Sequence, residues 1–245
     1  MSPDHMKIVE TKPSKKAFPF GDDRSVDQAF PNAISAVAAD PFLMCDDFSM
    51  QSRGAYNDPD KFPVDWHPHK GIDILTYLKS GVGRHADSLG NRVTFDTPGM
   101  QWMSTGSGVV HAEGGATPRG QTHSGFQIWV NVPAKDKLKP PRYGTAKPED
   151  IPQFDIGVNA QARVLAGEYP TTSNETAKGP FKTTQPVLIM DVELRDQAVV
   201  SLEIEDLYDS CMVYLYKGSG VIQQDRFEGR CLRSLEDVHL SLVPS

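Results

Sequence analysis

The chain has 245 residues, a formal net charge of −7, 38% hydrophobic residues and 23% charged residues. This composition is typical of a folded protein that buries a sizeable core, and it excludes a largely disordered chain. The acidic balance and the lack of a long Lys/Arg run argue against direct binding to nucleic-acid phosphates, which requires clustered cations. Contact with a protein that itself binds DNA is compatible with this charge.

Cysteine usage and hydropathy indicate the cellular compartment of the protein. Cys45, Cys211 and Cys231 are far apart and odd in number, so we predict neither a disulfide framework nor a Cys-x-x-Cys zinc site. The first 20 residues lack the apolar core of a signal peptide, and no window reaches the roughly 18 apolar residues of a membrane span. We expect a protein of the cytosol, the nucleus or both, which is not secreted and has no membrane partner.

The N-terminal part of the chain is rich in turns. Residues 1–35 are polar and contain four prolines, which predicts an arm with one or two strands, such as 7–11. The apolar run at 40–48 predicts a strand that enters a core. A turn-rich segment at 57–63 then leads to the sequence His67-Pro68-His69.

The middle of the chain has the pattern of short strands. Residues 72–78 are rich in β-branched and aliphatic side chains, which favours a strand, and turn signals follow at 88–91 and 98–99. Further strands are predicted at 92–96, 101–103, 108–113 and 125–132. Short strands at this spacing with Gly and Pro turns are typical of an antiparallel sandwich or barrel.

The second half looks like another β unit. Residues 133–153 contain five prolines and alternating charges, which predicts a boundary between domains. Strands recur at 162–166, 186–194, 199–204 and 212–216. After residue 222 the strand alternation becomes unclear, which predicts a unit that lacks a strand or more. Its one histidine is His239, so we expect no metal there.

Two triplets carry the chemistry. His67 with His69, and His111 with Glu113, are spaced at i and i+2, so each pair lies on one face of an extended segment. If the two strands are neighbours, three imidazoles and one carboxylate converge, a set that suits a divalent transition metal. Pro68 cannot donate a ladder hydrogen bond, which predicts an edge or rim position for its strand.

Four stretches carry a resemblance to a known family: DPFLMCDDF (40–48), HPHKGIDILTYLKSG (67–81), PGMQWMSTGSGVVHAE (98–113) and GFQIWVNVP (125–133). On these the chain resembles the pirins of the cupin superfamily, closely over residues 36–155 and weakly over 156–222. The resemblance implies an all-β bicupin, which consists of two antiparallel β-barrels of the double-stranded β-helix type.

The resemblance also implies a division of the chain. We expect an N-terminal arm with the first strands at 1–35, a metal-binding cupin domain at 36–135 and a proline-rich linker at 136–155. Residues 156–245 are expected to form a second, metal-free cupin domain. That domain is expected to be truncated, because the family continues for several more strands.

Pirins bind one metal, and the matching residues here are His67, His69, His111 and Glu113. The resemblance implies iron(II) first, with copper, nickel, manganese or cobalt as alternatives. It implies quercetin 2,3-dioxygenase-type activity, in which dioxygen cleaves the central ring of a flavonol and carbon monoxide is released. As a hypothesis, the flavonol hydroxyl loses its proton at the metal, and Glu113 acts as the catalytic base.

Other residues are expected to support this site. Strand parity and family position make Asp73, Trp102 and Gln127 candidates for contacts that orient the metal ligands. Asp73 stands where pirins usually have Glu, which is expected to change the pocket more than ligation. His85 and His123 are expected to be solvated or to support the ligands.

Two alternatives to the dioxygenase remain, and the first of them needs the same four ligands. The first is a non-enzymatic, iron-dependent co-regulator that binds a transcription factor in the nucleus, as is described for eukaryotic pirin. It predicts metal-dependent partner capture without turnover. The second is a catalytically idle cupin with an incomplete second barrel. The sequence alone leaves all three functions open.

Overall fold

The computed structural model describes most of the chain as β-strand. The described residues are 7–13, 15–20, 24–31, 34, 36–54, 58, 60–171, 173, 175–195, 198–203, 205, 207–208, 211–222, 225–228, 231–236 and 239–244. They form strands β1 to β23, with one four-residue helix, α1 (Ala36–Ala39), and two 3-10 turns. Every strand pair with a described register is antiparallel, for example β10 with β5 and β14 with β17. The predicted all-β class is confirmed, while two barrels and a truncated second barrel remain predictions.

The chain divides into two compact units. One comprises residues 16–28 and 41–151, and the other comprises 1–15, 29–40 and 152–245. The domain boundaries expected from the sequence stay a prediction. No helix among the described residues has the length and hydropathy required to cross a membrane.

The unit of residues 16–28 and 41–151 is built on a seven-stranded sheet in the order β12-β9-β6-β11-β4-β3-β2. The strands are β12 (Arg142–Ala146), β9 (Gly99–Ser104), β6 (Ile72–Ser80), β11 (Thr122–Asn131), β4 (Phe42–Gln51), β3 (Arg24–Phe30) and β2 (Lys15–Phe20). Strand β12 lies within the segment that the prolines marked as a linker, between the 3-10 turns η1 (Ala134–Asp136) and η2 (Pro148–Asp150). It is an integral part of this sheet because it pairs with β9.

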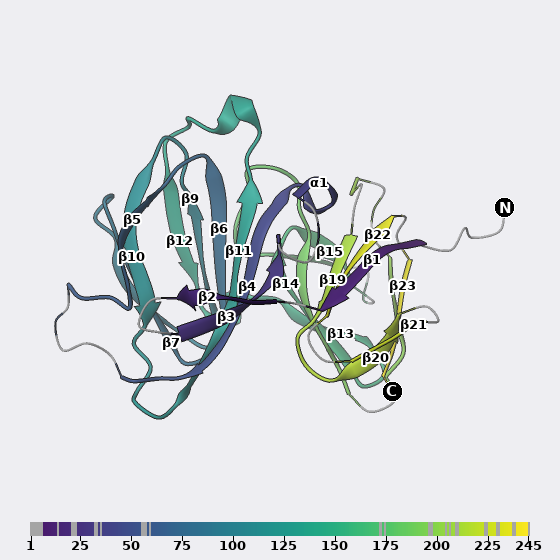
Figure 1. The fold of residues 1–245 in the computed structure, drawn as a ribbon. Helices are drawn as coiled ribbons and strands as arrows, with labels where there is room; N and C mark the ends of the chain where they lie inside the picture. The colour runs from purple at the N-terminus through teal and green to yellow at the C-terminus, as the bar shows by residue number, and fades with distance from the viewer. Residues whose placement is uncertain are drawn as a thin grey trace. The chain divides into compact units, whose positions relative to one another are not determined.

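A four-stranded sheet belongs to the same unit. Its order is β5-β10-β7-β8, and its strands are β5 (Val64–His69), β10 (Val109–Gly115), β7 (Val82–Asp87) and β8 (Arg92–Asp96). Figure 1 shows β5 beside β10, and β6 beside β9 and β11 in the larger sheet. The sequence predicted most of these strands, because alternation and glycine turns delimit them.

Apolar side chains from both sheets form the core of this unit. Val26, Phe48 and Leu78 come from the larger sheet and pack with Phe95 of β8. A second cluster joins Ile74 and Met103 of the larger sheet to Val109 of β10. Burial of each such side chain stabilises the fold by roughly 1.5–3 kcal/mol. The two sheets therefore enclose a common interior.

The other unit contains four smaller sheets. Their orders are β13-β14-β17, β15-β16, β1-β22-β19 and β18-β23-β20-β21. The strands are β13 (Gln153–Gly157), β14 (Ala160–Ala166), β17 (Ile189–Leu194), β15 (Glu168–Pro170), β16 (Thr176–Lys178), β1 (Lys7–Pro13), β22 (Cys231–Glu236), β19 (Cys211–Leu215), β18 (Val200–Glu203), β23 (His239–Pro244), β20 (Ser219–Ile222) and β21 (Asp225–Glu228).

The chain beyond residue 222, where the sequence shows no clear strand pattern, contributes β21, β22 and β23. Strand β22 pairs with β1 from the start of the chain, and β23 pairs with β18. These strands depend on partners that are distant in sequence, so local alternation is a weak guide to them.

Gly125 permits the close approach of two central strands. It lies on β11 at an irregularity in the pairing with β6. A Cβ atom at this position would lie 2.1 Å from the carbonyl oxygen of Tyr77, which is shorter than any normal contact. Only glycine therefore fits here without a shift of the backbone.

We expect Gly125→Ala to lower the free energy of unfolding by about 3 kcal/mol, because the new methyl group collides with backbone. The matched control is Gly90→Ala, where a Cβ meets nothing within 4 Å and the positive φ of 93° alone opposes the change. This control should cost about 1 kcal/mol. Urea unfolding followed by circular dichroism measures both, and equal losses would contradict the collision at Gly125.

Candidate metal centre

Three histidines meet where β5 and β10 pair. In this antiparallel pair His111 lies opposite His67, and Val109 lies opposite His69. The ring centroids are 4.4 Å apart for His67 and His111, 5.0 Å for His69 and His111, and 4.8 Å for His67 and His69. The neighbouring strands that the sequence required for convergence are present, and one nitrogen from each ring lies within 4.8 Å of the others.

Exposure differs among the three rings. Strand β5 is at the edge of its sheet, where Pro68 costs no ladder hydrogen bond, and both His67 and His69 are half-buried. His111 is 0% exposed because its side chain faces the interior, whereas the neighbouring Val110 on the opposite face of β10 is 41% exposed. The cluster therefore has a buried side and a side toward the rim.

Glu113 belongs to a second group. It lies with His111 and His85 so that one donor atom of each is within 4.8 Å of the others, and all three side chains are buried. The pairing of β10 with β5 shifts register between His111 and Glu113, whereas on β7 His85 lies directly opposite Glu113. The two groups share His111. The sequence placed all four predicted ligands in one set and did not include His85.

Hydrogen bonds fix the orientation of two of these imidazoles. Nδ1 of His67 donates to the carbonyl oxygen of Asp65 at 2.7 Å, which leaves Nε2 free to bind. Nε2 of His85 donates to Oδ2 of Asp87 at 3.1 Å, which leaves Nδ1 free. Histidine ligands of metals commonly donate their second nitrogen to a carbonyl or carboxylate in this way.

The Asp87 carboxylate is itself well supported. Burial raises its pKa, but hydrogen bonds from Asn91, His85 and Leu89 outweigh burial and lower the pKa overall. Asp87 therefore stays charged and keeps the ring of His85 in one orientation. His85, which the sequence expected to be solvated or supporting, is 1% exposed.

Buried ring nitrogens without hydrogen-bond partners are suited to bind a cation. Among the described residues, both ring nitrogens of His111 and Nδ1 of His85 are buried with no hydrogen bond. An unpaired buried polar atom costs about 1–3 kcal/mol, which a bound cation would offset. Three imidazoles and a carboxylate are also the donor types that iron, copper and nickel prefer. These residues therefore fit a divalent transition metal.

The protonation states favour the same use. Burial, with the neighbouring His67 and His85, lowers the pKa of His111 from 6.5 to about 3. Burial, with His111 and His67, lowers the pKa of His69 to about 4. Both rings are neutral at neutral pH, and the neutral ring is the form that binds a metal.

Amide donors hold the Glu113 carboxylate. Nε2 of Gln101 donates to Oε2 at 3.0 Å, and Nε2 of Gln127 donates to Oε1 at 2.5 Å. The amide oxygens of these glutamines accept hydrogen bonds in turn, from Tyr143 and Trp129. Glu113 is thus oriented at both oxygens, and action as a base would require one of these hydrogen bonds to break.

The residues that the sequence suggested as support for the metal ligands lie in different parts of this unit. Gln127 contacts Glu113 directly. Trp102 is 3% exposed, and its indole nitrogen donates to Ser104 Oγ. Asp73 is 1% exposed on β6 and lies opposite Ser104 in register. His123 is buried, with Nδ1 2.9 Å from the hydroxyl of Thr117.

Sequence reasoning missed three residues around the centre. Gln101 and Tyr143 support Glu113, and Trp129 lies edge-on to His69 with centroids 4.9 Å apart. The ring of Tyr143 also stacks on that of His85 at 4.2 Å. Trp129 had a signal in the sequence, because it follows Gln127 at i+2.

Two antiparallel sheets around a histidine-rich centre define a cupin-type protein, and comparison with known proteins agrees. The family model named Pirin matches residues 23–130. A Pseudomonas aeruginosa protein named "Putative quercetin 2,3-dioxygenase" is 32% identical over 209 residues, which are 83% of this chain and 70% of the relative. A "Pirin-like protein" of Solanum lycopersicum is 32% identical over 74% of this chain and 56% of its own length.

A solved structure extends the comparison to the whole fold. The crystal structure of a quercetin 2,3-dioxygenase from Acinetobacter baumannii matches with a TM-score of 0.84 and 27% identity, covering 97% of this chain and 82% of that one. The chain belongs to the pirin family. The resemblance recognised from the four sequence stretches is thereby confirmed.

Metal analysis of purified variants separates the two groups of possible ligands. We expect His67→Ala to lower the bound metal at least tenfold, because it removes one of the predicted ligands. His85→Ala, which removes an imidazole of the other group, should retain the metal. Elemental analysis measures both, and the reverse result would move the site to His85, His111 and Glu113.

The lowered pKa values predict how the metal-free protein responds to acid. An unfolded histidine takes up a proton below about pH 6.5, whereas folded His111 stays neutral down to about pH 3, so protons favour the unfolded chain. We expect stability to fall between pH 6.5 and 4, by about 1 kcal/mol per pH unit from His111. Urea unfolding of the metal-free protein and of His111→Gln measures this, and identical slopes would contradict it.

Proposed function

We propose that this protein is a metal-dependent oxidoreductase of the quercetin 2,3-dioxygenase type, which cleaves a flavonol with dioxygen. The observation that carries the proposal is the convergence of His67, His69 and His111 on one small volume, with Glu113 two residues along the same strand. The names of the relatives from Pseudomonas and Acinetobacter supply the substrate class.

We assign His67, His69, His111 and Glu113 as the ligands of one divalent transition metal, with iron(II) as the first choice. When bound, such a metal acts as a Lewis acid toward a flavonol hydroxyl and is the site at which dioxygen reacts. The protein supplies neutral imidazoles and a carboxylate that Gln101 and Gln127 hold in place. Glu113 remains the proposed base for the hydroxyl proton.

A cavity next to Glu113 offers a place for the substrate. It has a volume of about 60 Å³, and its wall includes Phe48, Leu78, Phe95, Thr76, Gln101 and Glu113. A space of this size holds about two to four water molecules, which is less than the roughly 150 Å³ of a cavity that encloses benzene. Apolar walls with a few placed polar groups are typical of small-molecule sites. We propose that the edge of one flavonol ring, with its hydroxyl, enters this cavity.

Turnover of quercetin tests the proposal. We expect the metal-loaded protein to take up dioxygen and release carbon monoxide, and His111→Ala to lose at least about 100-fold of this rate, because His111 belongs to both groups of ligands. Trp66→Phe is the matched control. Trp66 lies on β5 directly before His67 and is 41% exposed, and its variant should retain both metal and activity.

The outcome also separates the alternative functions. A co-regulator that binds a transcription factor predicts bound metal without oxygen uptake. An idle cupin with an incomplete second barrel predicts a protein without bound metal that does not melt in a two-state transition. Equal rates in the wild type and His111→Ala would contradict the dioxygenase proposal, since the reaction would then not depend on this centre.

A further inference from the structure

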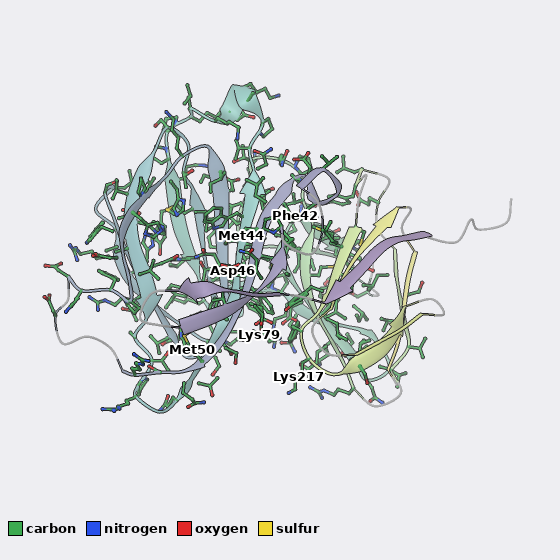
Figure 2. The ribbon with its side chains drawn as sticks, viewed as in Figure 1. Phe42, Met44, Asp46, Met50, Lys79 and Lys217 are labelled. Atoms are coloured by element: carbon green, nitrogen blue, oxygen red, sulfur yellow. The ribbon has the colours of Figure 1, made fainter. Side chains whose placement is uncertain are left out.

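Asp46 is an acidic residue in the wall of the cavity. Strand β4 lies between β11 and β3, and Asp46 is directly opposite Gln127 of β11. Asp46 and Met50, both labelled in Figure 2, are four positions apart on a regularly paired part of β4 and therefore share a face. Asp46, Phe48 and Met50 all line the cavity, so this face of β4 forms part of its wall.

The two oxygens of the Asp46 carboxylate differ in their hydrogen bonding. The side chain is 6% exposed, and Oδ1 accepts a hydrogen bond from Nε2 of Gln28 at 3.0 Å. Oδ2 has no hydrogen-bond partner within the described part of the chain. Burial raises the pKa of Asp46, and the bond from Gln28 offsets this only in part. This second oxygen can therefore accept a hydrogen bond from a ligand in the cavity.

The other polar groups of the cavity already have partners. The hydroxyl of Thr76 accepts from Gln101, and both oxygens of Glu113 accept from glutamines. The amide of Gln127 is used at both ends, by Glu113 and Trp129. His123 is paired with Thr117, and Arg84 is the remaining charged residue of the wall. Asp46 is therefore the acceptor that a ligand would meet.

We propose that Asp46 determines substrate specificity by accepting a hydrogen bond from a ring hydroxyl of the flavonol. The inference rests on the proposed function in one respect, since it takes the substrate to be a flavonol. The strands determine the position of Asp46. Gln127 pairs with Asp46 in register and donates to Glu113, so Asp46 and the candidate metal ligand Glu113 lie on opposite sides of Gln127. A ring edge in the cavity would contact Asp46 while the rest of the molecule extends toward Glu113.

The proposal predicts discrimination between two related flavonols. Quercetin carries hydroxyls on both outer rings, whereas 3-hydroxyflavone has the same 3-hydroxy-4-keto core without them. The hydrogen bond to Asp46 is lost with 3-hydroxyflavone, which weakens its binding relative to quercetin by roughly tenfold. Substitution of Asp46 should remove this difference.

The experiment measures binding of quercetin and 3-hydroxyflavone to the metal-loaded protein without dioxygen, by calorimetry. We expect the ratio of the two affinities to fall about tenfold in Asp46→Ala and by a smaller factor in Asp46→Asn, whose amide oxygen is a weaker acceptor. Asp47→Asn is the matched control. Asp47 is the next residue of β4, is 5% exposed, and faces away from the cavity by strand alternation, so the ratio should not change.

The outcomes distinguish this inference from the proposed function. An unchanged ratio in both Asp46 variants, when the wild type binds quercetin, would overturn the role of Asp46 and leave the dioxygenase proposal intact. Quercetin binding without oxygen uptake or carbon monoxide release would overturn the dioxygenase proposal, while the ratio still decides the role of Asp46. If neither flavonol binds the wild type, both are overturned. Should Asp46→Ala fail to fold, the near-isosteric Asp46→Asn provides the measurement.

Discussion

The antiparallel pairing of β5 with β10 is the constraint on which the candidate centre depends. It sets His67 opposite His111, and with His69 it brings three imidazoles within reach of one ion. The two strands differ in exposure, because β5 is an edge strand and β10 is internal. The ring of His111 is buried, while those of His67 and His69 lie near the rim, so the site has one buried side and one open side.

Burial and hydrogen bonding then determine what each group can do. Desolvation keeps His69 and His111 neutral, and this is the state that ligates a metal. Amides from Gln101 and Gln127 orient Glu113 from the larger sheet. The same sheet supplies Asp46 to the cavity wall, so the interior contains both the proposed metal site and the proposed site of substrate recognition. Both depend on the two sheets facing a common core.

The sequence predicted the fold class and most strands of the middle of the chain, because period-two alternation and glycine turns are local properties. Its metal-site prediction required β5 and β10 to be neighbours, because the four ligands converge only if the two strands lie side by side. It did not predict that β12 lies in a proline-rich segment or that the tail forms strands with β1 and β18. Those strands form because distant partners complete their hydrogen bonds, and pairing between remote segments leaves little trace in either segment alone.

For the site, the sequence alone specified the residue types of the four candidate ligands. The i, i+2 spacing of His67 with His69, and of His111 with Glu113, determined that each pair shares a face of its strand. The tertiary structure alone decided that Glu113 lies with His85, that Gln101 and Gln127 hold its carboxylate, and that Asp46 lines the same cavity. The reason is physical. A strand's alternation fixes which side chains share its face, but the register between strands, and the shift after His111, fixes which faces meet.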